Sequence, residues 1–189
     1  MYFDEVGSGI FNLDDKTAVF ENNITLAKDG DKEAFISIIE EYKADLYRMA
    51  RTILDNDEDI GDAMQETVLK AYRSLKSLKN LHSFKTWLIK IMVNECNNIL
   101  RNKKRLVFFN KGIEKEETYT DSYNLEKQPV LEAIKGLELK YRETVLLYYY
   151  EDLSVKEISK CLGISEGTVK SRLARARFKL FHLLREVRD

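Results

Sequence analysis

Only one proline, Pro129, occurs among the 189 residues of this chain, together with eight glycines. Proline ends helices and glycine weakens them, so a sequence with so few of both can sustain long helices. So few of these two residues also argue against an all-β chain, which needs many turns. From Ile24 onward, apolar residues recur at intervals of three and four over most of the chain, which is the period of an amphipathic helix. The sequence therefore predicts an all-α fold.

The helical pattern divides into two stretches. Residues 24–105 predict one small helical domain and residues 129–189 predict a second. Residues 106–128 are rich in acidic side chains and lose the periodicity, as expected of a flexible linker that leaves the relative orientation of the domains unset. Residues 1–23 carry scattered apolar side chains without a clear period, and we expect an N-terminal extension there.

Several function classes have no support in the sequence. The two cysteines, Cys96 and Cys161, lie far apart within helical apolar patterns, which favours buried, reduced thiols. The two histidines, His82 and His182, form no metal-ligand or triad pattern, and neither a glycine-rich phosphate loop nor an HExxH motif occurs. We therefore expect no catalytic residue, no metal and no cofactor, and a protein that is not an enzyme.

The N-terminal residues MYFDEVGSGIF lack the basic and apolar regions of a secretory signal. No apolar run approaches the roughly 18 residues that can span a bilayer. We expect a cytoplasmic protein with no direct membrane insertion.

Charge is distributed unevenly along the chain. Residues 1–66 carry 17 acidic and 6 basic side chains, whereas residues 67–128 carry 6 acidic and 13 basic, and residues 129–189 carry 9 acidic and 12 basic. Such a chain can offer an acidic face to one partner and basic faces to nucleic acid.

The strongest local pattern lies near the C-terminus. Ser154 and Glu157 have the spacing of a capping box that starts a helix. Gly163 can end that helix in the left-handed conformation, and Ser165 can cap the next one. Two capped helices joined by a short turn that contains glycine predict a helix-turn-helix.

The second helix of this motif has one apolar face and one basic face. Val169, Leu173 and Ala176 share the apolar face, while Arg172 and Arg175 lie on another. Because Ser171 and Ala174 are small, the N-terminal part of the helix can approach a major groove, where arginine and lysine reach guanine edges or phosphates. The alternative is a solvated basic helix, and the motif alone does not choose among classes of DNA-binding regulator.

The two halves together resemble a known family. Region 2 of the extracytoplasmic-function (ECF) sigma factors is similar to residues 55–75, DNDEDIGDAMQETVLKAYRSL, and to residues 83–105, SFKTWLIKIMVNECNNILRNKKR. Region 4 of the same family is similar to residues 129–180, which begin PVLEAIKGLELKYRETVLLYYYEDLSVKEIS. The order and separation of these matches are more specific than either match alone.

The resemblance implies an alternative sigma factor, which binds core RNA polymerase, directs it to the −35 and −10 elements of promoters and aids promoter melting. On this basis residues 24–105 form a region 2 domain that binds core polymerase and the −10 element. Residues 129–189 form a region 4 domain that binds the −35 element.

The polymerase-binding residues implied by the resemblance are Asp62, Gln65 and Glu66. They lie within five residues and project from adjacent parts of one helix. In the family this helix docks on the clamp helices of the β′ subunit, while region 4 meets the β flap. An acidic, amide-bearing ridge suits arginines there. The alternative is an ordinary exposed acidic face.

The −10 residues implied by the resemblance come from a loop and the helix that follows it. A base removed from the duplex needs a pocket and polar groups that read its edge, and Asn80, Ser83 and Leu81 offer these. Trp87 is a tempting stacking platform, but its apolar stripe favours core packing. The full set is Asn80, Leu81, His82, Ser83, Asn97 and Arg101, of which the last two share a helical face that suits upstream duplex DNA.

For the −35 element the resemblance implies base contacts from Lys170, Ser171, Ala174 and Arg175, with backbone contacts from Thr168 and Arg172. Some family members carry a larger side chain at the position of Ala174, so the preferred −35 sequence is left open.

Sigma factors of this group are usually held silent by an anti-sigma factor, which can be membrane-bound, and the resemblance implies such a partner. The alternative function is a helix-turn-helix regulator of another class. A response regulator would need an α/β receiver domain, but the first half of this chain has helical periodicity throughout.

Overall fold

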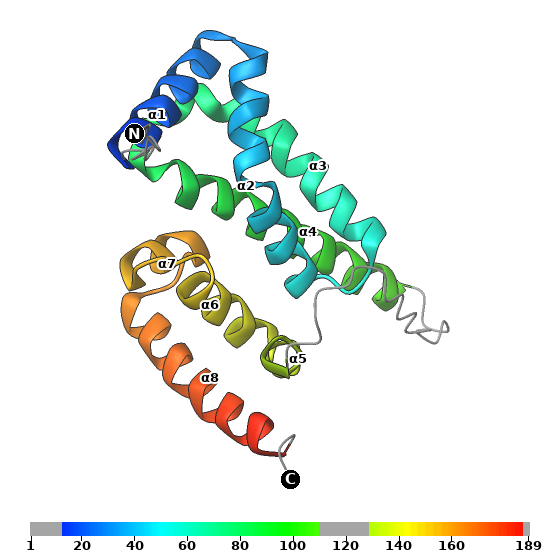
Figure 1. The fold of residues 1–189 in the computed structure, drawn as a ribbon. Coiled ribbons are helices and arrows are strands. Elements are labelled where there is room, and N and C mark those ends of the chain that lie inside the picture. The colour runs from blue at the N-terminus through cyan, green and yellow to red at the C-terminus, as the bar shows by residue number, and fades with distance from the viewer. Residues whose placement is uncertain (1–12, 110–128, 187–189) are drawn as a thin grey trace, which may run out of the picture.

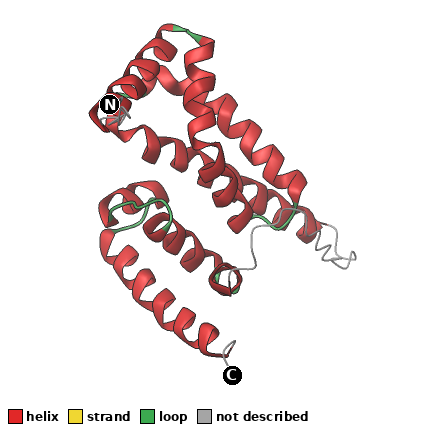
Figure 2. Ribbon diagram, in the orientation of Figure 1, coloured by secondary structure: helices red, strands yellow, loops and turns green. Residues whose placement is uncertain are grey.

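The computed structural model describes residues 13–109 and 129–186, and every regular element in these two ranges is a helix (Figure 2). The predicted all-α fold is confirmed. We call residues 13–109 the N-terminal domain and residues 129–186 the C-terminal domain. The N-terminal domain contains α1 (Leu13–Asp29), α2 (Lys32–Ile53), α3 (Asp57–Ser74), the 3-10 turns η1 (Leu75–Ser77) and η2 (Leu81–Ser83), and α4 (Phe84–Phe109). The C-terminal domain contains α5 (Pro129–Lys135), α6 (Leu139–Tyr149), α7 (Val155–Leu162) and α8 (Glu166–Glu186) (Figure 1).

Polar caps set where the helices of the N-terminal domain begin. The Asp31 side chain accepts a hydrogen bond from Ala34 N at 3.0 Å at the start of α2. The Asn56 side chain accepts one from Asp59 N at 2.8 Å at the start of α3. Such caps satisfy backbone N–H groups that have no partner within the helix.

None of the described helices is both long enough and apolar enough to cross a membrane.

The first helix begins earlier than the sequence predicted. We expected an extension over residues 1–23, but α1 already begins at Leu13. The ring of Phe20 lies 5.7 Å, between centroids, from the rings of both Tyr42 and Phe84, in edge-on contacts. The helical period was obscured because Val19, next to Phe20, is 60% exposed. The rest of the expected extension, residues 1–12, lies outside the described residues.

The last helix of the N-terminal domain extends further than the sequence predicted. We placed its start at residue 106, but α4 continues to Phe109. The remainder of that segment, residues 110–128, lies outside the described residues.

The predicted helix-turn-helix is present in the C-terminal domain with its capping interactions. Ser154 and Glu157 form both hydrogen bonds of a capping box at the start of α7. Gly163 ends α7 in the left-handed conformation with φ of 66°, which glycine adopts at little cost. Ser165 Oγ accepts a hydrogen bond from Thr168 N at 3.1 Å and caps α8. The apolar face of α8 packs inward, with Val169, Leu173 and Ala176 buried.

The two domains pack against each other along what we call the interdomain seam, where α7 contacts α4 and α6 contacts α2. Figure 1 shows α6 and α7 lying between α8 and the N-terminal domain. Leu146, Leu147 and Ile158 join the buried core of the N-terminal domain. Arg142 of α6 donates a hydrogen bond to the main-chain oxygen of Thr52 at 2.9 Å. We call this packed arrangement closed.

A buried carboxylate forms ion pairs across the seam. Glu151 is only 2% exposed. Lys85 Nζ lies 2.8 Å from the main-chain oxygen of Glu151 and 3.3 Å from its Oε2, and Arg48 Nη1 lies 3.9 Å from its Oε1. Burial and the nearby Asp45 raise the pKa of Glu151, whereas Lys85 and Arg48 oppose the rise. Burial in the seam therefore makes the ionised form of Glu151 less favourable than it would be in water.

Replacing Phe20 with alanine tests whether α1 belongs to the core. Phe20→Ala removes two aromatic contacts, and we expect the free energy of unfolding to fall by roughly 2 kcal/mol. Urea denaturation followed by circular dichroism measures this change. Val19→Ala is the matched control, because loss of an exposed side chain is expected to change stability by less than about 0.5 kcal/mol. Equal effects of the two substitutions would contradict the packing of α1.

The closed arrangement should depend on pH through Glu151. Since closure raises the pKa of this carboxyl above its ordinary value of 4.5, protonation favours the closed chain. This contribution is fully present below pH 4.5 and is lost as the pH rises through the raised pKa. Energy transfer between dyes on cysteines introduced at Glu33 and Arg185 should therefore increase on acidification from neutral pH. Glu151→Gln should weaken that dependence, and an unchanged profile in this variant would assign it to other groups.

Candidate nucleic-acid interface

The outward face of α8 carries cations beside small side chains. Lys170, Ser171, Ala174 and Arg175 are all exposed. The structure thus brings together on one accessible face the four residues that sequence analysis predicted to contact −35 bases. A face of this shape and charge can enter a major groove.

Hydrogen bonds stiffen the first turn of α8. The hydroxyls of Thr168 and Ser165 lie 2.8 Å apart, and the Ser171 hydroxyl donates to the main-chain oxygen of Thr168 at 2.9 Å. The hydroxyls of Thr168 and Ser171 are therefore already engaged within the helix. Lys170 and Arg175 are left as the long side chains available to a duplex.

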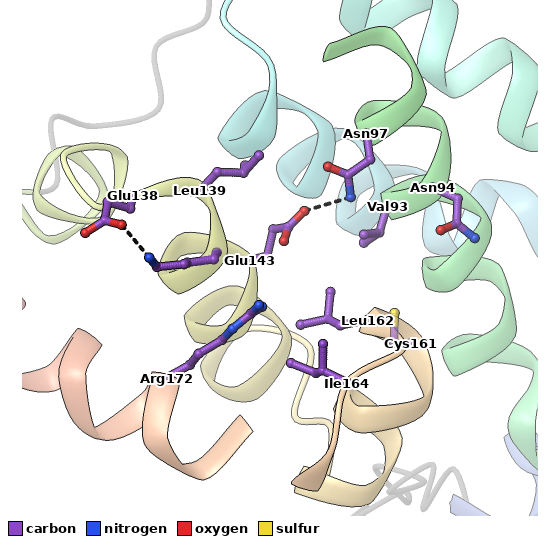
Figure 3. Close-up of a pocket in the computed structure, with 11 residues that line it drawn as sticks. Val93, Asn94, Asn97, Glu138, Leu139, Glu143, Cys161, Leu162, Ile164 and Arg172 are labelled. Carbon is purple, nitrogen blue, oxygen red and sulfur yellow. Dashed lines mark hydrogen bonds and ion pairs between the residues drawn. The ribbon is translucent and has the colours of Figure 1, made fainter. Parts of the chain in front are cut away.

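Arg172 is less accessible than the residues predicted to contact −35 bases. It is half-buried and lines a pocket at the interdomain seam (Figure 3).

Further along α8, Lys179 Nζ lies 2.9 Å from Glu138 Oε1, and Arg177 Nε donates to the Tyr149 hydroxyl at 2.7 Å. Hydrogen bonds from Lys140 and Lys179 hold the pKa of Glu138 at about 2. Arg177 and Lys179 therefore have partners within the C-terminal domain.

The loop predicted to read the −10 element forms the short turn η2. Asn80 Oδ1 accepts a hydrogen bond from His82 N at 3.1 Å, and the main-chain oxygen of Asn80 accepts one from Ser83 N at 3.1 Å. Leu81 is half-buried and packs against the core. His82 is exposed, with Nδ1 3.0 Å from Glu21 Oε1 on α1. Sequence reasoning missed this support from α1 because it placed Glu21 in an extension.

Asn97 and Arg101 lie further along α4 than the loop. Asn97 lies fourteen positions after Ser83, or about 20 Å along the helix. The structure therefore does not bring the two parts of the predicted −10 set together, and one DNA molecule would have to span them. Arg101 is exposed and donates a hydrogen bond to Asn98 Oδ1, whereas Asn97 Nδ2 donates to Glu143 Oε1 across the seam at 2.9 Å.

The acidic ridge predicted to bind polymerase is accessible. Asp62, Gln65 and Glu66 are all exposed on α3. They line a groove of about 610 Å³ together with residues of α4 that include Arg101. At the same groove Lys70 Nζ lies 2.6 Å from Glu95 Oε2 and joins the two helices. The predicted polymerase ridge and a predicted DNA contact thus share one groove.

Other candidate groups have structural roles. Trp87 is half-buried, with its ring 5.6 Å from that of Phe84, in agreement with core packing. Cys96 and Cys161 are buried, and burial raises the pKa of each thiol to about 12. In residues 13–109 and 129–186, no three His, Cys, Asp or Glu side chains group in a way that could hold a metal ion.

Comparisons with known proteins place both halves in one family. The model of sigma-70 region 2 matches residues 38–106, and the model of sigma-70 region 4 matches residues 127–180. RNA polymerase sigma factor SigV of Bacillus subtilis is 32% identical over 153 residues, which cover 77% of this chain and 87% of the relative. ECF RNA polymerase sigma factor SigW of the same organism is 30% identical over 184 residues, which cover 89% of this chain and 98% of the relative.

Solved structures agree with this assignment. The sigma factor RpoE in complex with the anti-sigma factor NepR, from Bartonella quintana, is 27% identical with a TM-score of 0.68, and the match covers 80% of this chain and 96% of RpoE. CnrH in complex with the cytosolic domain of CnrY shares the fold, with a TM-score of 0.67 at 24% identity over 89% of this chain and 98% of CnrH. The chain therefore belongs to the extracytoplasmic-function group of RNA polymerase sigma factors.

Proposed function

We propose that this chain binds core RNA polymerase and directs it to promoters by recognising a −35 element with its C-terminal domain and a −10 element with its N-terminal domain. The observation that carries the proposal is the presence of both sigma regions in one chain, over residues 38–106 and 127–180. In this proposal the polymerase supplies the phosphodiester chemistry. The sigma chain supplies placement and acts in the cytoplasm, where polymerase and promoter meet.

The polymerase contact proposed for Asp62, Gln65 and Glu66 rests on their exposure along one face of α3. Carboxylates and an amide in this arrangement suit arginine side chains of the β′ clamp helices. The C-terminal domain would meet the β flap.

The −35 contact proposed for α8 divides into two kinds. Lys170, Ser171, Ala174 and Arg175 face outward and suit base edges in the major groove. Thr168 lies at the first turn of α8 and Arg172 at the edge of its accessible face, where phosphate contacts would fix the register of the helix on the duplex.

The −10 contact proposed for η2 and α4 uses the groups that remain available there. The oxygen of Asn80 already caps η2, so its N–H groups are the donors left for a base edge. Ser83 offers a hydroxyl, Leu81 an apolar wall and His82 an exposed ring. Asn97 and Arg101 would hold the duplex upstream of the melted segment.

Recognition by two modules explains how weak contacts become selective. Each domain presents few base-reading side chains and should bind DNA weakly alone. Holding both on one polymerase makes the second contact intramolecular, which raises its effective concentration.

We also infer an anti-sigma partner for this chain, because the relative RpoE is bound to the anti-sigma factor NepR.

Removing the outward cations of α8 should abolish −35 selectivity. Lys170→Ala and Arg175→Ala should each lower transcription from a −35-dependent promoter by about tenfold, because one base contact is worth about 1–3 kcal/mol. Reconstituted transcription with core polymerase and a randomised promoter library measures both rate and base preference. Arg185→Ala is the matched control, since it removes an exposed cation from the far end of the same helix. Identical promoter preferences in all three variants would refute the assignment.

Neutralising the ridge on α3 should weaken polymerase binding. The double variant Asp62→Asn with Glu66→Gln should lose about tenfold in affinity for core polymerase, or about 1.4 kcal/mol, because two charge-assisted contacts are lost. Competition against a second sigma factor for limiting core enzyme measures the change. Glu40→Gln with Glu41→Gln removes the same charge from exposed positions on α2 and should compete like the unaltered chain. Equal losses in the two double variants would argue for a general charge effect.

A further inference from the structure

A pocket of about 430 Å³ lies at the interdomain seam, where α4, α6, α7 and α8 meet (Figure 3). Its lining comes from both domains. The polar residues are Asn94 and Asn97 of α4, Glu138, Lys140 and Glu143 at and within α6, and Arg172 of α8. Two of these, Asn97 and Arg172, are residues for which we propose contacts with promoter DNA.

Glu143 occupies the space between those two residues. Its side chain is 6% exposed, and its Oε1 accepts the hydrogen bond from Asn97 Nδ2 at 2.9 Å. Figure 3 shows Glu143 between Asn97 and Arg172. Burial raises the pKa of Glu143, whereas the hydrogen bond from Asn97 and the charges of Arg172 and Arg142 act in the opposite direction. The carboxylate thus accepts a hydrogen bond from one proposed DNA contact, Asn97, and shares the pocket with the other, Arg172.

A carboxylate offers these side chains the same chemistry as DNA. Asparagine amides and arginine guanidinium groups bind nucleic acid by donating to anionic or carbonyl oxygens. Glu143 presents such oxygens from within the chain. In the closed arrangement it therefore takes, at Asn97, the position that a phosphate or base edge would take.

Asn97 and Arg172 are only partly accessible while the seam is closed, because both are half-buried and line the pocket. At about 30 Å³ per water molecule, the pocket holds on the order of a dozen waters. A duplex whose major groove alone is about 12 Å wide cannot enter it. Full contact of Asn97 with DNA thus requires its hydrogen bond to Glu143 to break, and separation of the domains would expose both Asn97 and Arg172.

We propose that Glu143 is an internal competitor of promoter DNA, which helps to hold the domains closed and keeps Asn97 and Arg172 from DNA until the seam opens. The DNA roles of those two residues rest on the proposed function, whereas the closing role of Glu143 rests on the seam alone. The proposal predicts that the closed chain binds duplex DNA more weakly than the same chain with its domains separated.

Glu143→Lys tests the proposal in the full-length chain. The substitution places an ammonium group beside Arg172 and Arg142 in a buried site, so the seam should open. Energy transfer between the dyes at Glu33 and Arg185 should fall, and circular dichroism should show unchanged helix content. Glu138→Lys is the matched control, because it makes the same charge change at an exposed position on the rim of the same pocket.

Duplex binding provides the second readout. Fluorescence anisotropy with a labelled duplex of fixed sequence, about three helical turns long, measures the affinity at constant salt. If the closed chain makes up about nine in ten molecules, Glu143→Lys should bind about tenfold more tightly than Glu138→Lys, since apparent affinity scales with the competent fraction. Glu143→Gln keeps an acceptor for Asn97, so it should keep the energy transfer of the unaltered chain or exceed it.

Unchanged energy transfer in Glu143→Lys would overturn the proposal, and so would an open variant that binds DNA no better than Glu138→Lys. If Glu143→Lys fails to fold, Asn97→Asp replaces it, because two facing carboxylates should also open the seam. A chain with Asn97→Asp that stays closed at a pH high enough to ionise both carboxyls would then refute the role of Glu143. Neither readout uses polymerase, so a chain that opens as expected but never binds core enzyme would refute the proposed function alone.

Discussion

The packing of α6 and α7 against α2 and α4 decides which surfaces of this chain can meet a partner. Because α6 and α7 lie between α8 and the N-terminal domain, the outward face of α8 stays accessible while its inner edge, at Arg172, is half-buried. The same packing covers Asn97 on α4 but leaves the ridge on α3 exposed. The seam therefore divides the proposed contacts into two groups. We call ready those that are accessible in the closed chain, and withheld those that are half-buried at the seam.

The composition of the seam suits an interface that must also open. Burial of Leu146, Leu147 and Ile158 favours closure, by roughly 1.5–3 kcal/mol for each side chain relative to an exposed one. Against this, Glu143 and Glu151 are acids held away from water, and the effective penalty for a buried ion is several kcal/mol before its partners compensate. Because these opposing contributions are of similar size, the net free energy of closing the seam is small. A small difference lets the chain populate both closed and open states. An all-apolar seam would close the chain permanently.

Local interactions explain what the sequence could predict. The capping box at Ser154 and the left-handed Gly163 depend on residues within one turn of each other, so the helix-turn-helix and its outward face followed from spacing alone. The hydrogen bond between Asn97 and Glu143 joins residues 46 apart in sequence, and no periodic pattern encodes it. A signal was nevertheless present in α6, which is apolar on more than one side and yet contains Glu143. A helix of that kind is buried on two faces, and the second face meets the N-terminal domain.

The division between ready and withheld surfaces sets an order of events for the proposed function. Asp62, Gln65 and Glu66 are exposed in the closed chain, so the polymerase contact proposed for them can form before any DNA is engaged. A polymerase that touched only this ridge would bind open and closed chains equally and would open neither, because a ligand shifts an equilibrium only by its difference in affinity for the two states. Opening therefore requires a second contact that only the separated domains can make, such as one between the C-terminal domain and the β flap. Opening of the seam therefore requires polymerase to bind this chain at two separated sites, and a single strong site would not be sufficient.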